Sequence, residues 1–416
     1  MSLEAAPVLE TDALIDDPET RIVVCCGAGG VGKTTSAAAL GVRAAERGRK
    51  VVVLTIDPAR RLAQSMGLTE LDNTPRRVTD VDGSKGGELH AMMLDMKRTF
   101  DEIVEAHADP ERARAILDNP FYESLSAGFA GTQEYMAMEK LGQLRARDEW
   151  DLIIVDTPPS RSALDFLDAP KRLGSFLDGR FIRLLMAPAK AGGRAGMKFV
   201  SLGMTGLSMV TGTLGKVLGT GLLRDVQTFV AAMDTMFGGF RTRADATYRL
   251  LQAPGTAFLV VAAPERDALR EAAYFVERLA ADRMPLAGLI LNRVHGSEAD
   301  QLSAERALAA AEVLEDAAAG PGEDPGSDSG SGPGEDTHSA ASAAGLLRLH
   351  AERMRVLARE RRTRDRFAAL HPEVPVAEVA ALPGDVHDLV GLRTIGERLG
   401  TQRGQLAATE TSSRLS

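Results

Sequence analysis

The feature that most constrains the fold of this chain is a glycine-rich segment near its amino terminus, which reads GAGGVGKTT from Gly27 to Thr35. It follows a short apolar run at 21–26 and opens a segment of helical composition that continues to about Arg47. The letters match G-x-x-x-x-G-K-[S/T] in the strand–loop–helix setting that this motif requires. Glycines let successive backbone N–H groups turn toward one phosphate, and the following helix adds the positive end of its dipole. The segment therefore predicts a phosphate-binding loop.

The residue types within this loop indicate separate roles. Lys33 is expected to reach the β- and γ-phosphates of a nucleoside triphosphate, and the Thr34 hydroxyl is expected to bind Mg²⁺. The same letters also fit G-x-G-x-x-G, a dinucleotide-binding pattern, with Asp57 placed to bind a ribose. A dinucleotide site needs neither the lysine nor the metal-binding hydroxyl, so the triphosphate interpretation is favoured. The predicted phosphate-binding residues are Gly27, Gly29, Gly30, Val31, Gly32, Lys33, Thr34 and Thr35.

Two further carboxylates follow predicted strands. Asp57 comes after the apolar run 51–56, and Asp156 ends the run 152–156. In a parallel sheet covered by helices, ligands gather at the carboxyl ends of the strands, so both acids are expected near Lys33. Phosphoryl transfer needs an acid that holds Mg²⁺ through water, which suits Asp156, and a group that orients the attacking water, which suits Asp57. The alternative for each acid is that it caps the helix that follows.

Short apolar runs recur along the chain, with helical segments between them. Most are apolar throughout rather than alternating, which is typical of strands buried on both faces. The predicted fold is therefore α/β: a doubly wound, mainly parallel sheet of the P-loop NTPase type with an inserted helical subdomain. The runs lie at 21–26, 51–56, 89–94, 152–156, 258–263 and 287–292, with a weaker run near 374–379.

Composition divides the chain further. The segment 320–336 contains only Gly, Pro, Ser and acidic residues, so it cannot bury enough apolar surface to order itself. The basic helix predicted at 346–366 is either a solvated amphipathic helix or a site for an anionic partner or for the acidic loop itself.

The chain is expected to consist of a core, an insertion and three further segments. We expect a P-loop core at 21–96, 151–160 and 255–400, and a helical insertion that binds a client or partner at 97–150 and 161–254. The further segments are an acidic amino-terminal tail at 1–20, a disordered acidic loop within the core at 317–344 and a carboxyl-terminal tail at 401–416.

One stripe in the insertion has two interpretations. Met136, Met138, Leu141 and Leu144 recur at helical spacing. Such a stripe is more often core, and the alternative is an adaptable groove for apolar helices.

Charge and cysteine content exclude several classes of protein. The chain of 416 residues has a net charge of −9 and only 4% aromatic residues, so no nucleic-acid partner is expected. The two cysteines, Cys25 and Cys26, are adjacent and can form neither a disulfide framework nor a zinc site. With no signal peptide or spanning segment apparent, we expect a cytoplasmic protein, with peripheral contact to a membrane left open.

The motifs resemble one family of ATPases. The segments Gly27–Thr35, Asp57-Pro58-Ala59 and Asp156-Thr157-Pro158-Pro159 are similar to those of the deviant Walker A class, and within it to the arsenite-pump (ArsA-like) family, which includes targeting factors for tail-anchored membrane proteins. The resemblance implies Mg²⁺-dependent hydrolysis of ATP by a dimer, with Asp57 polarising the attacking water. It also implies that Asn292 reads the adenine edge while Pro383 packs nearby; the alternative for Asn292 is a turn-forming residue.

Departures from the family pattern shape the expected partners. The deviant class has a second lysine after the first glycine of the loop, where this chain has Ala28. We therefore expect a heterodimer with a related ATPase subunit that keeps the lysine. A homodimer, slow hydrolysis, or replacement of the charge by Arg60 or Arg161 are the alternatives. The expected client is a hydrophobic segment or a membrane protein. Alternative functions are the energising subunit of an anion efflux pump and a catalytically weak regulatory partner of an active paralogue.

Overall fold

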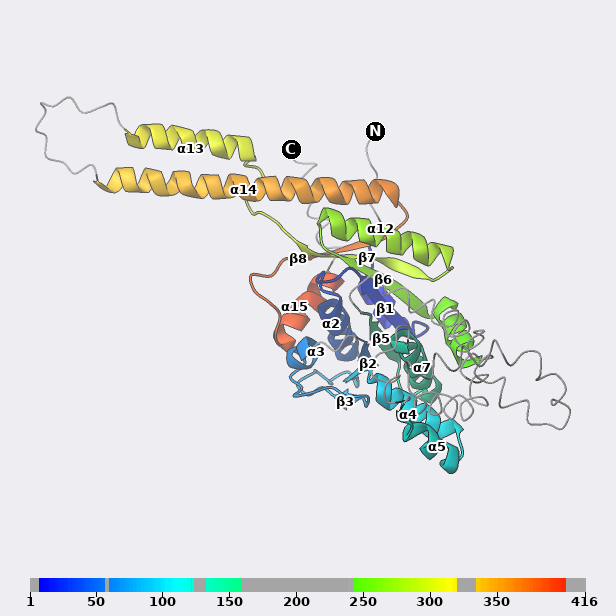
Figure 1. The fold of residues 1–416 in the computed structure, drawn as a ribbon. Helices are drawn as coiled ribbons and strands as arrows, with labels where there is room; N and C mark the ends of the chain where they lie inside the picture. The colour runs from blue at the N-terminus through cyan, green and yellow to red at the C-terminus, as the bar shows by residue number, and fades with distance from the viewer. Residues whose placement is uncertain are drawn as a thin grey trace, which may run out of the picture.

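The structure, a computed structural model, describes residues 7–56, 60–120, 122, 132–158, 239, 242–319 and 334–401. These residues contain an eight-stranded sheet in the order β3-β4-β2-β5-β1-β6-β7-β8 (Figure 1). All neighbouring strands are parallel except the pair β3–β4. The predicted α/β class is confirmed, and the short strand β3 was not expected. The strands are β1 Ile22–Gly27, β2 Lys50–Thr55, β3 Arg76–Arg77, β4 Glu88–Met93, β5 Leu152–Asp156, β6 Thr256–Ala262, β7 Leu286–Val294 and β8 Val376–Ala380.

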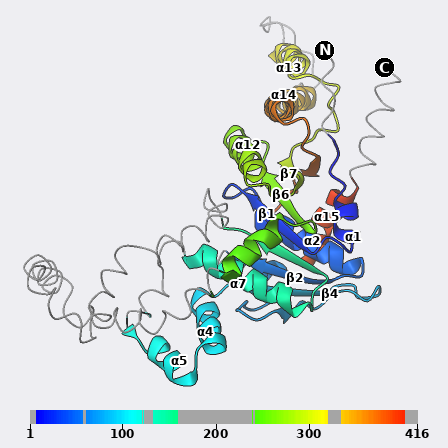
Figure 2. The same cartoon turned by 90° about the vertical axis from the view of Figure 1, so that its right-hand side faces the viewer.

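Helices cover both faces of the sheet, so its central strands are buried throughout (Figure 2). Side chains that are adjacent in a strand point to opposite faces, which is why Cys25 and Cys26 belong to two different buried clusters. The cluster of Cys25 lies against α2 and α15, and that of Cys26 against α7, α12 and a helix over 242–252. The helices beside the sheet are α2 Lys33–Glu46, α3 Arg60–Ser65, α4 Met96–His107, α5 Pro110–Leu117, α7 Thr132–Arg147, α12 Arg266–Ala281 and α15 Leu389–Gly400.

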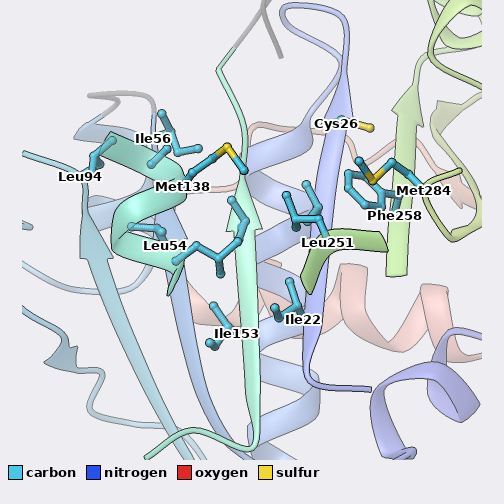
Figure 3. Close-up of a cluster of buried hydrophobic side chains, with 14 of the residues drawn as sticks. Ile22, Cys26, Leu54, Ile56, Leu94, Met138, Ile153, Leu251, Phe258 and Met284 are labelled. Carbon is cyan, nitrogen blue, oxygen red and sulfur yellow. The ribbon is translucent and has the colours of Figure 1, made fainter. Parts of the chain in front are cut away.

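The apolar stripe of α7 is part of the core. Met136, Met138, Leu141 and Leu144 are at most 3% exposed and pack with residues of β1, β2 and β5. Figure 3 shows Met138 within this cluster, together with Ile56 and Ile153. The interpretation of the stripe as core is therefore confirmed, and the groove interpretation is wrong for these four residues.

The amino-terminal segment is not a tail from residue 7 onward, which corrects the expectation for 1–20. It contains α1 (Thr11–Asp16), whose Ile15 is fully buried. The acidic residues face arginines of α2: Asp12 accepts hydrogen bonds of 2.5 and 2.6 Å from Arg43, and Asp16 pairs with Arg47. The hydrogen bond from Arg43 holds the pKa of the Asp12 carboxyl below its usual value. The acidic residues, which in the sequence suggested a tail, therefore form ion pairs that hold α1 against α2.

The predicted bounds of the loop at 317–344 are also wrong, because both of its ends are helical. Helix α13 spans Ala304–Ala319 and helix α14 spans Gly334–Leu370, so helical structure enters the segment from each side. The two helices lie side by side as an antiparallel arm that extends beyond the sheet (Figure 1). They bury Ala311 and Ala351, and Arg348 forms two hydrogen bonds of 2.8 and 2.6 Å with Glu315. Residues 320–333 lie outside the described residues.

Most of the predicted insertion at 161–254 also lies outside the described residues, as do 402–416 of the expected carboxyl-terminal tail. In the part of the chain that the structure describes, none of the helices has the length and apolar character needed to cross a membrane.

Candidate nucleotide-binding site

The glycine-rich segment forms a loop between β1 and α2, as predicted. Gly27 ends β1 at φ +149°, and a Cβ atom built there would lie 2.1 Å from the Val261 carbonyl oxygen of β6. Gly32 precedes the first residue of α2 and has φ +97°, a left-handed conformation that L side chains rarely adopt. The backbone of the loop therefore requires glycine at both ends. Gly29 and Gly30 between them are exposed, so the tip of the loop is open to a ligand.

Lys33 is the first residue of α2 and is only 6% exposed. Its Nζ donates a hydrogen bond of 2.8 Å to the carbonyl oxygen of Ala28, at the opposite end of the loop. A buried ammonium group is costly unless strong acceptors surround it, and phosphate oxygens are stronger acceptors than a neutral carbonyl. The position of the Lys33 ammonium group inside the loop agrees with the predicted contact to phosphates.

Asp156 ends β5 and is fully buried next to the loop. Its Oδ2 accepts hydrogen bonds from the hydroxyl of Thr34 at 2.7 Å and from that of Thr55 at 3.0 Å. Thr34 comes from the first turn of α2 and Thr55 from the end of β2, so three elements converge on one carboxylate. Hydroxyl and carboxylate oxygens are the ligands that Mg²⁺ prefers, and the pair of Thr34 and Asp156 fits that ion. Thr55 was missed, although a threonine directly before the Ile-Asp pair was a signal.

The chain that leads to Asp57 lies beside Asp156. Ile56 donates its backbone N–H to the Asp156 carbonyl at 3.0 Å, and its own carbonyl accepts from Gln133 Nε2 at 3.0 Å. Gln133 lies in the first turn of α7 and was also missed as a site residue. Asp57, Pro58 and Ala59 lie outside the described residues. The role of Asp57 therefore stays a prediction.

Asn292 and Pro383 occupy different surroundings. Asn292 lies in β7, is 6% exposed, and donates from Nδ2 to the Val31 carbonyl of the loop at 2.9 Å. This long-range bond differs from the local contacts of a turn-forming asparagine. Pro383 is exposed in the segment between β8 and α15. That these two residues contact an adenine stays a prediction.

The two thiols beneath the loop should be chemically inert in the folded protein. Both cysteines are buried, and this burial raises the pKa of Cys26 to about 12 and also raises the pKa of Cys25. At neutral pH both groups therefore remain as thiols, whereas the thiolate is the reactive form. We expect an aromatic disulfide reagent to react with neither thiol in the native protein and with both in urea, measured by absorbance. Rapid reaction of the native protein would contradict this assignment.

The loop, Lys33 and the Thr34–Asp156 pair lie at the carboxyl ends of strands in a mainly parallel sheet. This arrangement defines a P-loop NTPase fold. The family model described as "Anion-transporting ATPase" (ArsA) matches residues 20–316, more than half of the chain. The chain belongs to this family, which confirms the resemblance drawn from the motifs.

Individual relatives are distant. The ATPase GET3 of Malassezia globosa is 28% identical over 38% of this chain and 45% of its own length. A Halobacterium salinarum protein that carries the name of an arsenical pump-driving ATPase is 30% identical over 44% of this chain and 28% of its own length. The ATPase GET3 of Podospora anserina is 24% identical over 73% of this chain and 82% of its own length. The first two matches span less than half of each relative.

Proposed function

We propose that this chain binds ATP with Mg²⁺ and hydrolyses it as one subunit of a nucleotide-dependent switch. The observation that carries the proposal is the 2.7 Å contact between the Thr34 hydroxyl and the Asp156 carboxylate, next to a buried Lys33 at the start of α2. A lysine, a hydroxyl and a carboxylate arranged around a glycine loop are the groups that phosphoryl transfer uses. Membership of an ATPase family supports the same conclusion.

The residues of the site have distinct tasks in this mechanism. Backbone N–H groups at the start of α2 bind phosphate oxygens, helped by the helix dipole. Lys33 exchanges its contact with the Ala28 carbonyl for the terminal phosphates. Thr55 keeps the Asp156 carboxylate oriented through its 3.0 Å hydrogen bond. Mg²⁺, when bound by Thr34 and Asp156, supplies positive charge that offsets the negative charge of the phosphates. Asp57 orients the attacking water.

Hydrogen bonds connect the residue before Asp57 to helix α7, so loss of the γ-phosphate could move that helix. Ile56, the residue before Asp57, is hydrogen-bonded to the end of β5 on one side and to Gln133 of α7 on the other. Loops that contact a γ-phosphate commonly release when it leaves. We propose that movement at Asp57 is transmitted through Ile56 to α7 and the predicted insertion, where a hydrophobic client or membrane protein binds.

The partner is proposed to be a related ATPase subunit. Ala28 occupies the position of the second lysine of the deviant class, and it is 8% exposed. No cation extends from this position toward a second nucleotide. A heterodimer with a chain that keeps the lysine supplies one such charge, whereas a homodimer supplies none from this position.

We expect the isolated chain to hydrolyse ATP slowly. A cation supplied in trans increases phosphoryl transfer about 10³-fold or more in other systems. At protein concentrations where two copies of the chain associate, replacing Ala28 by lysine should therefore raise turnover, whereas Ala28→Met, which adds an uncharged side chain about as long as lysine, should not. Turnover is measured as phosphate release over a wide range of protein concentration, and the thermal unfolding midpoint checks that both variants fold.

Fast hydrolysis by the unmodified chain, rising with its own concentration, would contradict the heterodimer and favour a self-sufficient homodimer. The second candidate function, a regulatory subunit with little activity of its own, is favoured by the same Ala28. It would be supported if Ala28→Lys remained slow while the unmodified chain bound ATP normally.

A further inference from the structure

Strand β7 contains a bulge directly after Asn292. Leu289 to Asn292 pair with Val376 to Val379 of β8 in regular parallel register, and the register then shifts so that Val294 pairs with Ala380. Arg293 is passed over and has φ +62°, a left-handed conformation. This conformation costs a non-glycine residue of order 1 kcal/mol, and bulges occur preferentially where a side chain must be re-aimed near a site. The bulge therefore indicates that the orientation of the Asn292 side chain is important for the nearby site.

Asn292 fits closely against the phosphate loop. Its Nδ2 atom lies 2.9 Å from the Val31 carbonyl oxygen, and a Cβ atom built on Gly32 would lie 2.2 Å from the same Nδ2. A side chain at position 32 would displace the amide, so the glycine gives Asn292 access to the loop. The amide is also buried, which strengthens its hydrogen bond relative to one in water.

This hydrogen bond sets the direction of a phosphate-binding group. Val31 C=O and Gly32 N–H belong to one planar peptide, and no cis peptide bond occurs among the described residues, so the two groups point in opposite directions. With its carbonyl held toward β7, the peptide directs the Gly32 N–H away from β7. Gly32 immediately precedes α2, where backbone N–H groups bind anions.

We propose that Asn292 is a positioning residue of the phosphate loop, which sets the orientation of the Val31–Gly32 peptide and so contributes to triphosphate affinity whatever base the nucleotide carries. This inference rests on the proposed function, because it assumes that the loop binds phosphate. It is separate from the adenine contact that the family resemblance implies, because it acts on the phosphates. A base-reading residue affects ATP alone, whereas a positioning residue affects every ligand that carries the triphosphate.

Three ligands separate these roles: Mg²⁺–ATP, Mg²⁺–GTP and Mg²⁺–tripolyphosphate, with dissociation constants measured by calorimetry on the full chain. Asn292→Ala removes the donor, and Asn292→Asp places a carboxylate oxygen against the Val31 carbonyl. Loss of one buried hydrogen bond corresponds to an affinity loss of about five- to tenfold, and the aspartate should cost more. We expect this loss of affinity for tripolyphosphate and for Mg²⁺–GTP as well as for Mg²⁺–ATP. Arg293→Gly, which adopts the left-handed conformation freely and leaves the amide in place, is the matched control and should bind all three as the unmodified chain does.

Each other outcome counts against a specific claim. A loss confined to ATP, with tripolyphosphate binding unchanged, would overturn the inference in favour of adenine reading. A lower unfolding midpoint with unchanged affinity per folded molecule would show that Asn292 is only structural. If the unmodified chain bound none of the three ligands, the proposed function itself would fail.

Discussion

Replacing Lys33 by methionine should weaken the binding of ATP by about two to four powers of ten. The ammonium group is expected to contact two phosphates, and each charge-assisted hydrogen bond contributes about 1.5–3 kcal/mol, where 1.4 kcal/mol is tenfold in affinity. Methionine keeps most of the length of the side chain and introduces no unpaired polar atom into a position that is 6% exposed. The variant removes a costly buried charge but also the hydrogen bond to the Ala28 carbonyl, so these effects oppose each other and the free energy of unfolding without ligand should change by only about 1 kcal/mol. Affinity is measured by calorimetry with Mg²⁺–ATP.

The matched control is Lys50→Met. Lys50 begins β2 at the opposite end of the sheet, with its Nζ 5.2 Å from the centre of the Trp150 ring. It lies on a strand of the same sheet but far from the carboxyl edge, so ATP affinity should be unchanged. Equal losses in the two variants, or no loss in Lys33→Met, would contradict the assignment of Lys33 to the phosphates.

Replacing Arg49 by methionine should lower the free energy of unfolding by about 3–5 kcal/mol. Arg49 is 9% exposed, and its guanidinium donates to four backbone carbonyl groups at distances between 2.5 and 2.9 Å. Each carbonyl loses the guanidinium in the variant, and only that of Asp17 has a second donor among these contacts, the Thr20 N–H at 3.0 Å. A buried acceptor without a partner is costly. The four carbonyls belong to Ile15, Asp17, Thr20 and Asp151.

The measurement is urea unfolding, followed by circular dichroism. Arg47→Met is the control two residues away: Arg47 forms a partly exposed ion pair with Asp16, and such pairs contribute about 1 kcal/mol or less. ATP affinity per folded molecule should be unchanged in both variants, because Arg49 contacts the amino-terminal segment and residue 151 rather than the loop. If Arg49→Met were no less stable than Arg47→Met, the four carbonyl contacts would not hold this segment in place.

The apolar runs predicted seven strands close to their observed positions. For β1, β5 and β6 the reason is that strands buried on both faces need uniformly apolar sequences. The loop was predictable because its backbone requires glycine. Gly27 and Gly32 have backbone conformations and close neighbours that exclude a side chain, so the motif can be recognised from its glycines. The short strand Arg76–Arg77 was not predictable, since two arginines carry no strand signal.

Other elements depend on partners that lie far away along the chain. The acids of α1 suggested a solvated tail, and only their ion pairs with α2 showed a packed helix. The length of the arm formed by α13 and α14 depends on their mutual packing, which local composition does not express.

The sequence by itself determined the class of fold, the phosphate loop and the positions of the acids after β2 and at the end of β5, because these depend on local backbone geometry and on burial patterns. The tertiary structure decided the order of the strands, the convergence of Thr34 and Thr55 on Asp156, and the contact of Asn292 with Val31. These last features join segments 101 to 261 residues apart. Hydrogen bonds between such distant residues produce no periodic pattern in the sequence. They form because the order and register of the strands bring these residues together.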